Sequence, residues 1–162
     1  MTRVAVIADT HLPRGARRLP DACLERMRES DLVLHAGDFT SAAFLAELEA
    51  LGPPVVGVHG NMDEPALKES LPRERIVEVD GVRVGMVHIP GPRTGREARL
   101  VARFPGCGAI VYGHTHVPQV ERFGHVWILN PGSPTERRTS PGHAMLLLRI
   151  EQGEIEPRLI PI

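Results

Sequence analysis

The sequence is poor in several residue types, and each shortage excludes a class of protein. Lys68 is the only lysine among 19 basic residues, which we attribute to genome composition. The two cysteines, Cys23 and Cys107, are too few for a disulfide framework, and neither has a second cysteine at metal-ligand spacing. No apolar run approaches the ~20 residues of a membrane helix, and no signal-peptide pattern precedes the first predicted strand. These absences predict reduced thiols, a cytoplasmic location and no membrane partner.

The charge balance gives no sign of a polyanionic partner. With 19 basic and 20 acidic residues, the formal net charge is −1, so we expect no specific nucleic-acid binding. The 162 residues, 42% of them hydrophobic, suit one domain spanning residues 1–162. The sequence leaves the oligomeric state open, and a homo-oligomer is compatible with it.

The first half of the chain alternates short apolar runs with helical patterns. The run from Val4 to Ala8 has no polar interruption, which is typical of a strand buried on both faces. Strands are predicted at 4–8, 31–36 and 55–59, with helices at 20–29 and 41–51, the second capped by Ser41. This β-α-β-α-β order predicts parallel strands joined by right-handed crossovers.

The second half is richer in strands. Asp80-Gly81 predicts a tight hairpin turn between strands at 75–79 and 82–88. A helix is predicted at 97–104 and a strand at 109–112, followed by antiparallel strands at 118–123, 126–130, 144–150 and 154–160.

Polar side chains follow five of the predicted strands, at the point where each apolar run stops. If the backbone after the first strand stays extended, Asp9 and His11 point to the same side. Ligands of α/β proteins bind at such a rim, where carboxylate, amide and imidazole groups together suit divalent metal ions. The residues concerned are Asp9 and His11, Asp38, Asn61 and Asp63, His88, and His114 and His116.

This series of motifs resembles the calcineurin-like metallophosphoesterases, most closely their small bacterial and archaeal phosphodiesterase branch. The resemblance runs from residue 3 to about Ser133 and includes Asn130-Pro131-Gly132-Ser133. It implies an α/β fold, a four-layer α/β/β/α sandwich with two mixed β-sheets. It also implies a hydrolase in which a metal-bound hydroxide attacks a small or nucleotide-like phosphate ester.

The resemblance further implies two metal ions per chain. Their ligands would be Asp9, His11 and His116 for one ion, Asn61, His88 and His114 for the other, and Asp38 as a bridge. Two ions roughly 3.5–4 Å apart bind a phosphoryl oxygen and lower the pKa of a bridging water. Nitrogen and oxygen donors without thiolate favour Mn²⁺, with Fe, Zn²⁺, Ni²⁺ and Co²⁺ as alternatives.

We expect Asp38, Asn61 and Asp63 to take part in catalysis. Asp63 either orients a neighbouring ligand or has a structural role at a helix N-terminus. Many members of the family carry a histidine after the motif asparagine, where this chain has Met62, which transfers no proton. The general acid is therefore unassigned, and good leaving groups should be favoured.

Several other residues keep two interpretations. His35 either supports the metal ligands or is a buried structural histidine. His59, His125 and His143 are interpreted as solvated or structural, and Arg93, Arg96 and Arg137 as surface arginines rather than phosphate ligands. A scaffold that kept the fold but little activity is the alternative function. A DNA nuclease would need a basic groove or a further domain, and the sequence shows neither.

Overall fold

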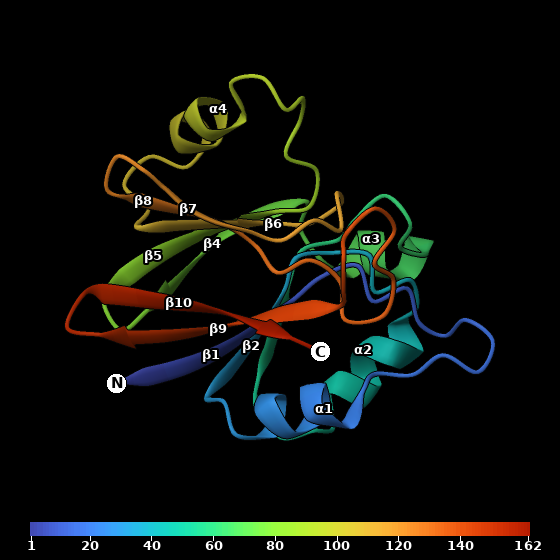
Figure 1. Cartoon of the computed structure of the whole chain (residues 1–162). Coiled ribbons are helices and arrows are strands. Elements are labelled where there is room, and N and C mark those ends of the chain that lie inside the picture. The colour runs from blue at the N-terminus through green and yellow to red at the C-terminus, as the bar shows by residue number, and fades with distance from the viewer.

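The structure, a computed structural model, describes all 162 residues and contains two five-stranded sheets packed face to face (Figure 1). The first sheet has the order β10-β9-β1-β2-β3, with β1 at Thr2–Ile7, β2 at Leu32–His35, β3 at Val55–Gly57, β9 at Ala144–Glu151 and β10 at Glu154–Pro161. The second has the order β4-β5-β6-β8-β7, with β4 at Glu74–Val79, β5 at Val82–Val87, β6 at Ala109–Tyr112, β7 at Gln119–Phe123 and β8 at Val126–Asn130.

Helices cover the outer face of each sheet. The four helices are α1 at Asp21–Arg28, α2 at Ala42–Glu49, α3 at Pro65–Ser70 and α4 at Arg96–Arg103. Figure 1 shows α1 and α2 below the first sheet and α4 above the second. Both sheets mix parallel and antiparallel pairs, so the predicted four-layer sandwich with two mixed sheets is confirmed. The longest helices have eight residues, and none could cross a bilayer.

The side chains of β1 explain why this strand lies in the middle of the fold. Val4 and Val6 pack into the apolar cluster between the two sheets. Ala5 and Ile7 pack into the cluster between the first sheet and helices α1 and α2. Alternate residues of a strand point to opposite faces, so a strand with layers on both sides needs the uninterrupted apolar run seen here. The prediction that this strand is buried on both faces is confirmed.

The expectation that the last four strands are antiparallel holds for the pairs β7–β8 and β9–β10 but not for all of their neighbours. Strand β8 is antiparallel to β7 but parallel to β6, with Ile128 paired to Ile110, so the last four strands are not one antiparallel series. They divide between the sheets, because β9 returns to pair with β1. The short helix α3, which begins at Pro65, was not predicted. Local turn residues indicate where strands end but carry little information about distant partners.

Candidate metal centre

Five of the seven predicted metal ligands have left-handed backbone conformations. The φ angles are +54° at Asp9, +47° at His11, +59° at Asp38, +71° at His114 and +60° at His116. Residues other than glycine seldom adopt such angles, which cost of order 1–3 kcal/mol each and cluster at functional sites. The expectation of extended backbone from Asp9 to His11 was therefore wrong. Their amides instead donate to the carbonyls of Gly37 and Asp38, at 2.9 and 3.1 Å.

Three side-chain atoms from two distant loops converge beside the end of β1. Asp9 Oδ1 lies 3.8 Å from His11 Nε2 and 3.4 Å from His116 Nε2. All three atoms are buried and none has a hydrogen-bond partner. Buried polar atoms are almost always paired, so unpaired donors and acceptors that face one another fit a metal ion.

Asp38 lies between this group and a second one. Its Oδ2 is 3.4 Å from His11 Nε2 and 3.2 Å from His88 Nε2, while its Oδ1 accepts the backbone N–H of Met62 at 2.8 Å. One carboxylate oxygen is thus held by the backbone and the other faces histidines of both predicted ligand sets. This is the geometry that a bridging carboxylate requires.

The second set forms around the side-chain amide of Asn61. Its Oδ1 lies 3.1 Å from His88 Nε2 and 3.2 Å from His114 Nδ1. The structure therefore brings all seven predicted ligands to one rim. Imidazole nitrogens, two carboxylates and one amide suit first-row divalent ions, and the set identifies none of them.

Hydrogen bonds on the far side of two rings fix which nitrogen faces the site. His88 Nδ1 lies 2.7 Å from the carbonyl of Ala36, and His116 Nδ1 lies 2.5 Å from the carbonyl of Glu136. A carbonyl only accepts, so each Nδ1 carries a proton and donates it. In the neutral ring Nε2 then presents its lone pair to the site, as metal-binding histidines require.

Asp63 holds the backbone around the site and is buried. Its carboxylate accepts the N–H groups of Gly60, Thr40 and Asp38, at 2.6, 2.7 and 3.1 Å. These contacts support the left-handed backbone at Asp38 and Thr40, so the structure assigns Asp63 a positioning role. A direct part in catalysis stays a prediction.

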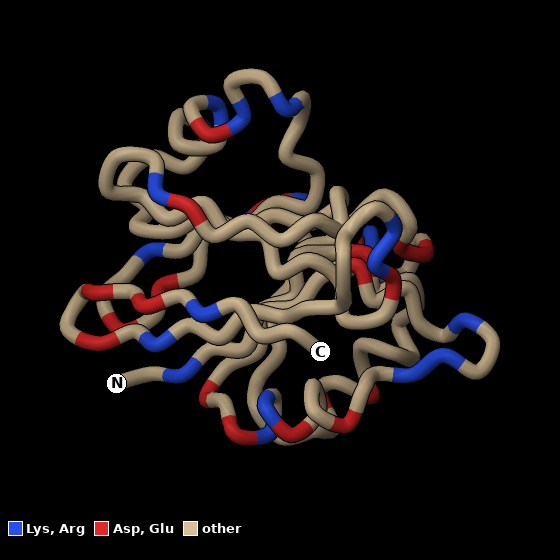
Figure 2. The backbone as a smooth tube through the Cα atoms, in the orientation of Figure 1, with Lys and Arg blue, Asp and Glu red and all other residues tan.

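Glu136 is a supporting residue that sequence reasoning missed. Its backbone carbonyl accepts the hydrogen bond from His116 Nδ1. Its carboxylate lies 4.0 Å from His11 Nδ1 and forms ion pairs with Arg14 and Arg17 at 3.2 and 3.1 Å. The two arginines belong to the basic loop between β1 and α1 (Figure 2). In the sequence, Glu136 could have been noticed because it lies three residues after Ser133, the last residue of the Asn130–Ser133 motif. The Ser133 hydroxyl donates to the Asp9 carbonyl at 2.8 Å, so this segment lies beside the site.

His35 supports the site from the end of β2. Its Nδ1 accepts the Gly37 N–H at 3.1 Å, so its Nε2 carries the proton and donates to the Thr10 hydroxyl at 2.9 Å. Complete burial lowers the pKa of His35 to about 3, which keeps the ring neutral. Of the two interpretations of His35, the structure favours support of the loop between Asp9 and His11.

The two carboxylates and the histidines shift one another's pKa. Burial raises the pKa of Asp38, but the adjacent imidazoles of His11 and His88 outweigh it and hold this pKa well below its usual range. Burial lowers the pKa of His11, but the nearby carboxylates of Asp38 and Asp9 outweigh it and raise this pKa to about 9. The pKa of His88 is also raised, because the same carboxylates outweigh its burial.

Metal binding at pH 7 is therefore expected to release about one proton from His11, which must lose its proton to act as a ligand. Below a pKa of about 9, His11 is charged and a proton competes with the metal ion for its nitrogen. The apparent affinity for Mn²⁺ should therefore rise with pH up to about 9. Mn²⁺ titration calorimetry in buffers of different ionisation enthalpy counts the protons. Binding with no proton release at pH 7 would contradict these assignments.

Gly60 leaves room that Asp38 needs, so Gly60→Ala is expected to weaken metal binding. A Cβ atom there would lie 2.1 Å from Asp38 Oδ1, and the carboxylate would have to move. Such overpacking also costs typically 1–3 kcal/mol of unfolding free energy. Gly142→Ala is the matched control, since its Cβ would meet nothing within 4 Å. Mn²⁺ affinity and thermal unfolding of both variants check this, and equal behaviour would argue against it.

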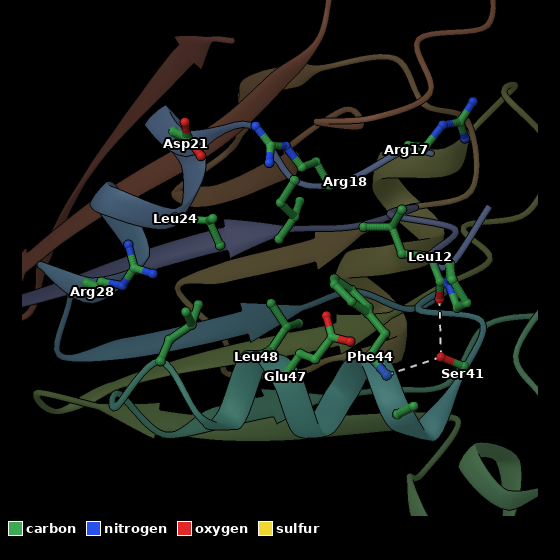
Figure 3. Close-up of a pocket in the computed structure, with 14 residues that line it drawn as sticks. Leu12, Arg17, Arg18, Asp21, Leu24, Arg28, Ser41, Phe44, Glu47 and Leu48 are labelled. Carbon is green, nitrogen blue, oxygen red and sulfur yellow. Dashed lines mark hydrogen bonds between the residues drawn. The ribbon is translucent and has the colours of Figure 1, made fainter. Parts of the chain in front are cut away.

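Two hollows lie near the site, and only one of them includes predicted ligands. A groove of about 440 Å³ between α1 and α2 has an apolar floor of leucines and Phe44, and Figure 3 shows Ser41 capping α2 beside it. None of the seven residues lines this groove. A cavity of about 270 Å³ includes both Asn61 and His88 in its wall.

The chain is similar to known proteins over nearly its whole length. The model of the calcineurin-like phosphoesterase superfamily domain matches residues 2–153. A probable metallophosphoesterase of Methanothermobacter thermautotrophicus is 38% identical to this chain, and the match covers 97% of this chain and 91% of the relative. A phosphodiesterase of Methanocaldococcus jannaschii is 25% identical, and the match covers 80% of this chain and 82% of the relative. The solution structure of a Thermotoga maritima protein, 33% identical, covers both chains completely with a TM-score of 0.79. The chain belongs to the calcineurin-like phosphoesterase superfamily.

Proposed function

We propose that the protein is a phosphodiesterase that uses two divalent metal ions, Mn²⁺ foremost, to hydrolyse small or nucleotide-like phosphate esters. One observation carries the proposal: Asp9 Oδ1, His11 Nε2 and His116 Nε2 face one another buried and unpaired, next to Asp38. The Methanocaldococcus relative described as a phosphodiesterase supports the choice of diesters.

The chain's own residues set the charge of this site. Two divalent ions, when bound, would polarise a phosphoryl oxygen and lower the pKa of a water molecule. Asp9 and Asp38 are the only carboxylates among the seven residues, and they offset half of the four positive charges. Asn61 adds an oxygen donor without adding negative charge. With both ions bound, the remaining positive charge would attract a phosphate ester and stabilise charge that develops on its oxygens.

Metal analysis followed by a substrate panel tests this function. We expect about two transition-metal ions per chain after purification with added Mn²⁺, and Mn²⁺-dependent hydrolysis of bis(p-nitrophenyl) phosphate that chelation abolishes. One ion or fewer per chain, or hydrolysis that survives chelation, would contradict the proposal.

A scaffold of the same fold is the second candidate, and one observation favours it. Met62, Ile89 and Val117 each follow a predicted ligand, and their exposed fractions are 55%, 39% and 42%. Exposed apolar side chains around a site are typical of docking surfaces. Metal binding at full occupancy without turnover of any ester in the panel would favour the scaffold over the enzyme.

A further inference from the structure

The cavity beside Asn61 and His88 has a basic wall. Besides these two predicted ligands, its polar side chains are Lys68, Arg73 and His59, and the remainder of its lining is glycine and aliphatic. No carboxylate lines it. A space that adjoins a metal centre and contains only cationic and neutral groups favours an anionic occupant.

Most of the hydrogen-bonding capacity of these cations is unused. Lys68 Nζ donates to the Asn61 carbonyl at 3.0 Å, which leaves two of its three N–H groups free. Arg73, an exposed residue in the wall of the cavity, makes no side-chain hydrogen bond and no ion pair, so its guanidinium is available to an anion. The chain's only lysine and an unpaired arginine thus stand together next to the site.

The location relates this cavity to the substrate. Asn61 and His88 belong to its wall and to the predicted metal site, so a phosphate held at the metals would adjoin this cavity. The cavity has a volume of about 270 Å³, which is ample for a single anionic group. It suits a phosphate or carboxylate group, and a guanidinium binds either one through two parallel hydrogen bonds.

We propose that this cavity binds a second anionic group of the substrate, a phosphate or a carboxylate, while the scissile phosphate lies at the metals. This inference rests on the proposed function. The substrate class is then phosphate esters that carry a further anion a few bonds from the scissile phosphorus. Lys68 and Arg73 would determine this specificity, and a simple diaryl ester would leave the cavity empty.

Two phosphonates with the same three-carbon chain test the proposal by binding alone. 3-Phosphonopropionate carries a terminal carboxylate, and propylphosphonate does not. Calorimetry with Mn²⁺-loaded protein should show about tenfold tighter binding of 3-phosphonopropionate, as expected of charge-assisted hydrogen bonds. In Arg73→Gln, and in Lys68→Gln, the preference should fall to about twofold or less. Arg158→Gln on β10, at the opposite edge of the first sheet from β3, is the control and should keep the full preference.

The outcomes separate this inference from the function on which it rests. Equal binding of the two phosphonates, or a preference that survives both variants, would overturn the inference alone. If neither phosphonate binds, the proposed function is overturned and the inference with it. Free propionate should not tighten propylphosphonate binding, and if it does, the anion is a separate small molecule rather than part of the substrate.

Discussion

Asp38→Asn is expected to weaken Mn²⁺ binding at both metal sites at once, by at least about 100-fold. Loss of a residue that merely supports a ligand costs 10–100-fold in metal affinity, and a shared ligand should cost no less. Asp38 Oδ2 faces both groups, at 3.4 Å from His11 Nε2 and 3.2 Å from His88 Nε2, whereas Asp9 Oδ1 is further from His88 Nε2, at 3.8 Å. Equilibrium dialysis with Mn²⁺ measures both the affinity and the number of ions bound.

His116→Ala is the matched comparison for this variant. Its Nε2 lies 3.4 Å from Asp9 Oδ1, and its ring belongs to one predicted ligand set only. It should therefore lower the affinity of one ion and leave the second ion bound. If Asp38→Asn removes one ion, or His116→Ala removes both, Asp38 is not the bridge.

Aryl phosphodiesters are expected to be hydrolysed about 10²–10⁴-fold faster than simple alkyl diesters, the range that a positioned general acid contributes. An alkoxide needs a proton as it leaves, whereas a nitrophenolate does not. Met62 follows Asn61, its side chain is 55% exposed, and its thioether carries no transferable proton. The measurement is kcat/KM for matched aryl and alkyl diesters with Mn²⁺. In addition, kcat is followed across pH for the alkaline limb that deprotonation of a general acid would produce, which should be absent.

Met62→His should then accelerate the alkyl diesters selectively. The exposed side chain leaves room for an imidazole, and the backbone N–H of residue 62 would keep its bond to Asp38 Oδ1. Met62→Gln, which is similar in size and equally unable to act as an acid at neutral pH, is the control. Equal rates for alkyl and aryl esters in the wild type, with chemistry rate-limiting, would show that another residue supplies the proton.

The sequence was informative wherever one residue's surroundings are set by its own strand. The apolar run at Val4–Ala8 predicted β1 and its burial, and the polar residue at the end of each later run predicted which side chains meet at the rim. Parallel strands bring their carboxyl ends to one edge, so this prediction needs no distances.

Long-range contacts set the features that the sequence did not reveal. The left-handed backbone of Asp9 and His11 is unfavourable locally and is held by the carbonyls of Gly37 and Asp38, from another loop. Glu136 contacts His11, which is more than a hundred residues away in the sequence, and His116, which is twenty residues away. Propensity and periodicity describe neighbours along the chain, so neither predicts such contacts.

Anomalous diffraction from crystals grown with Mn²⁺ is the most direct test of the two-metal centre. We expect two anomalous peaks roughly 3.5–4 Å apart, with Asp38 bound to both, Asp9, His11 and His116 around one, and Asn61, His88 and His114 around the other. A single peak, or two peaks with Asp38 beyond direct coordination of either ion, would contradict the dinuclear assignment.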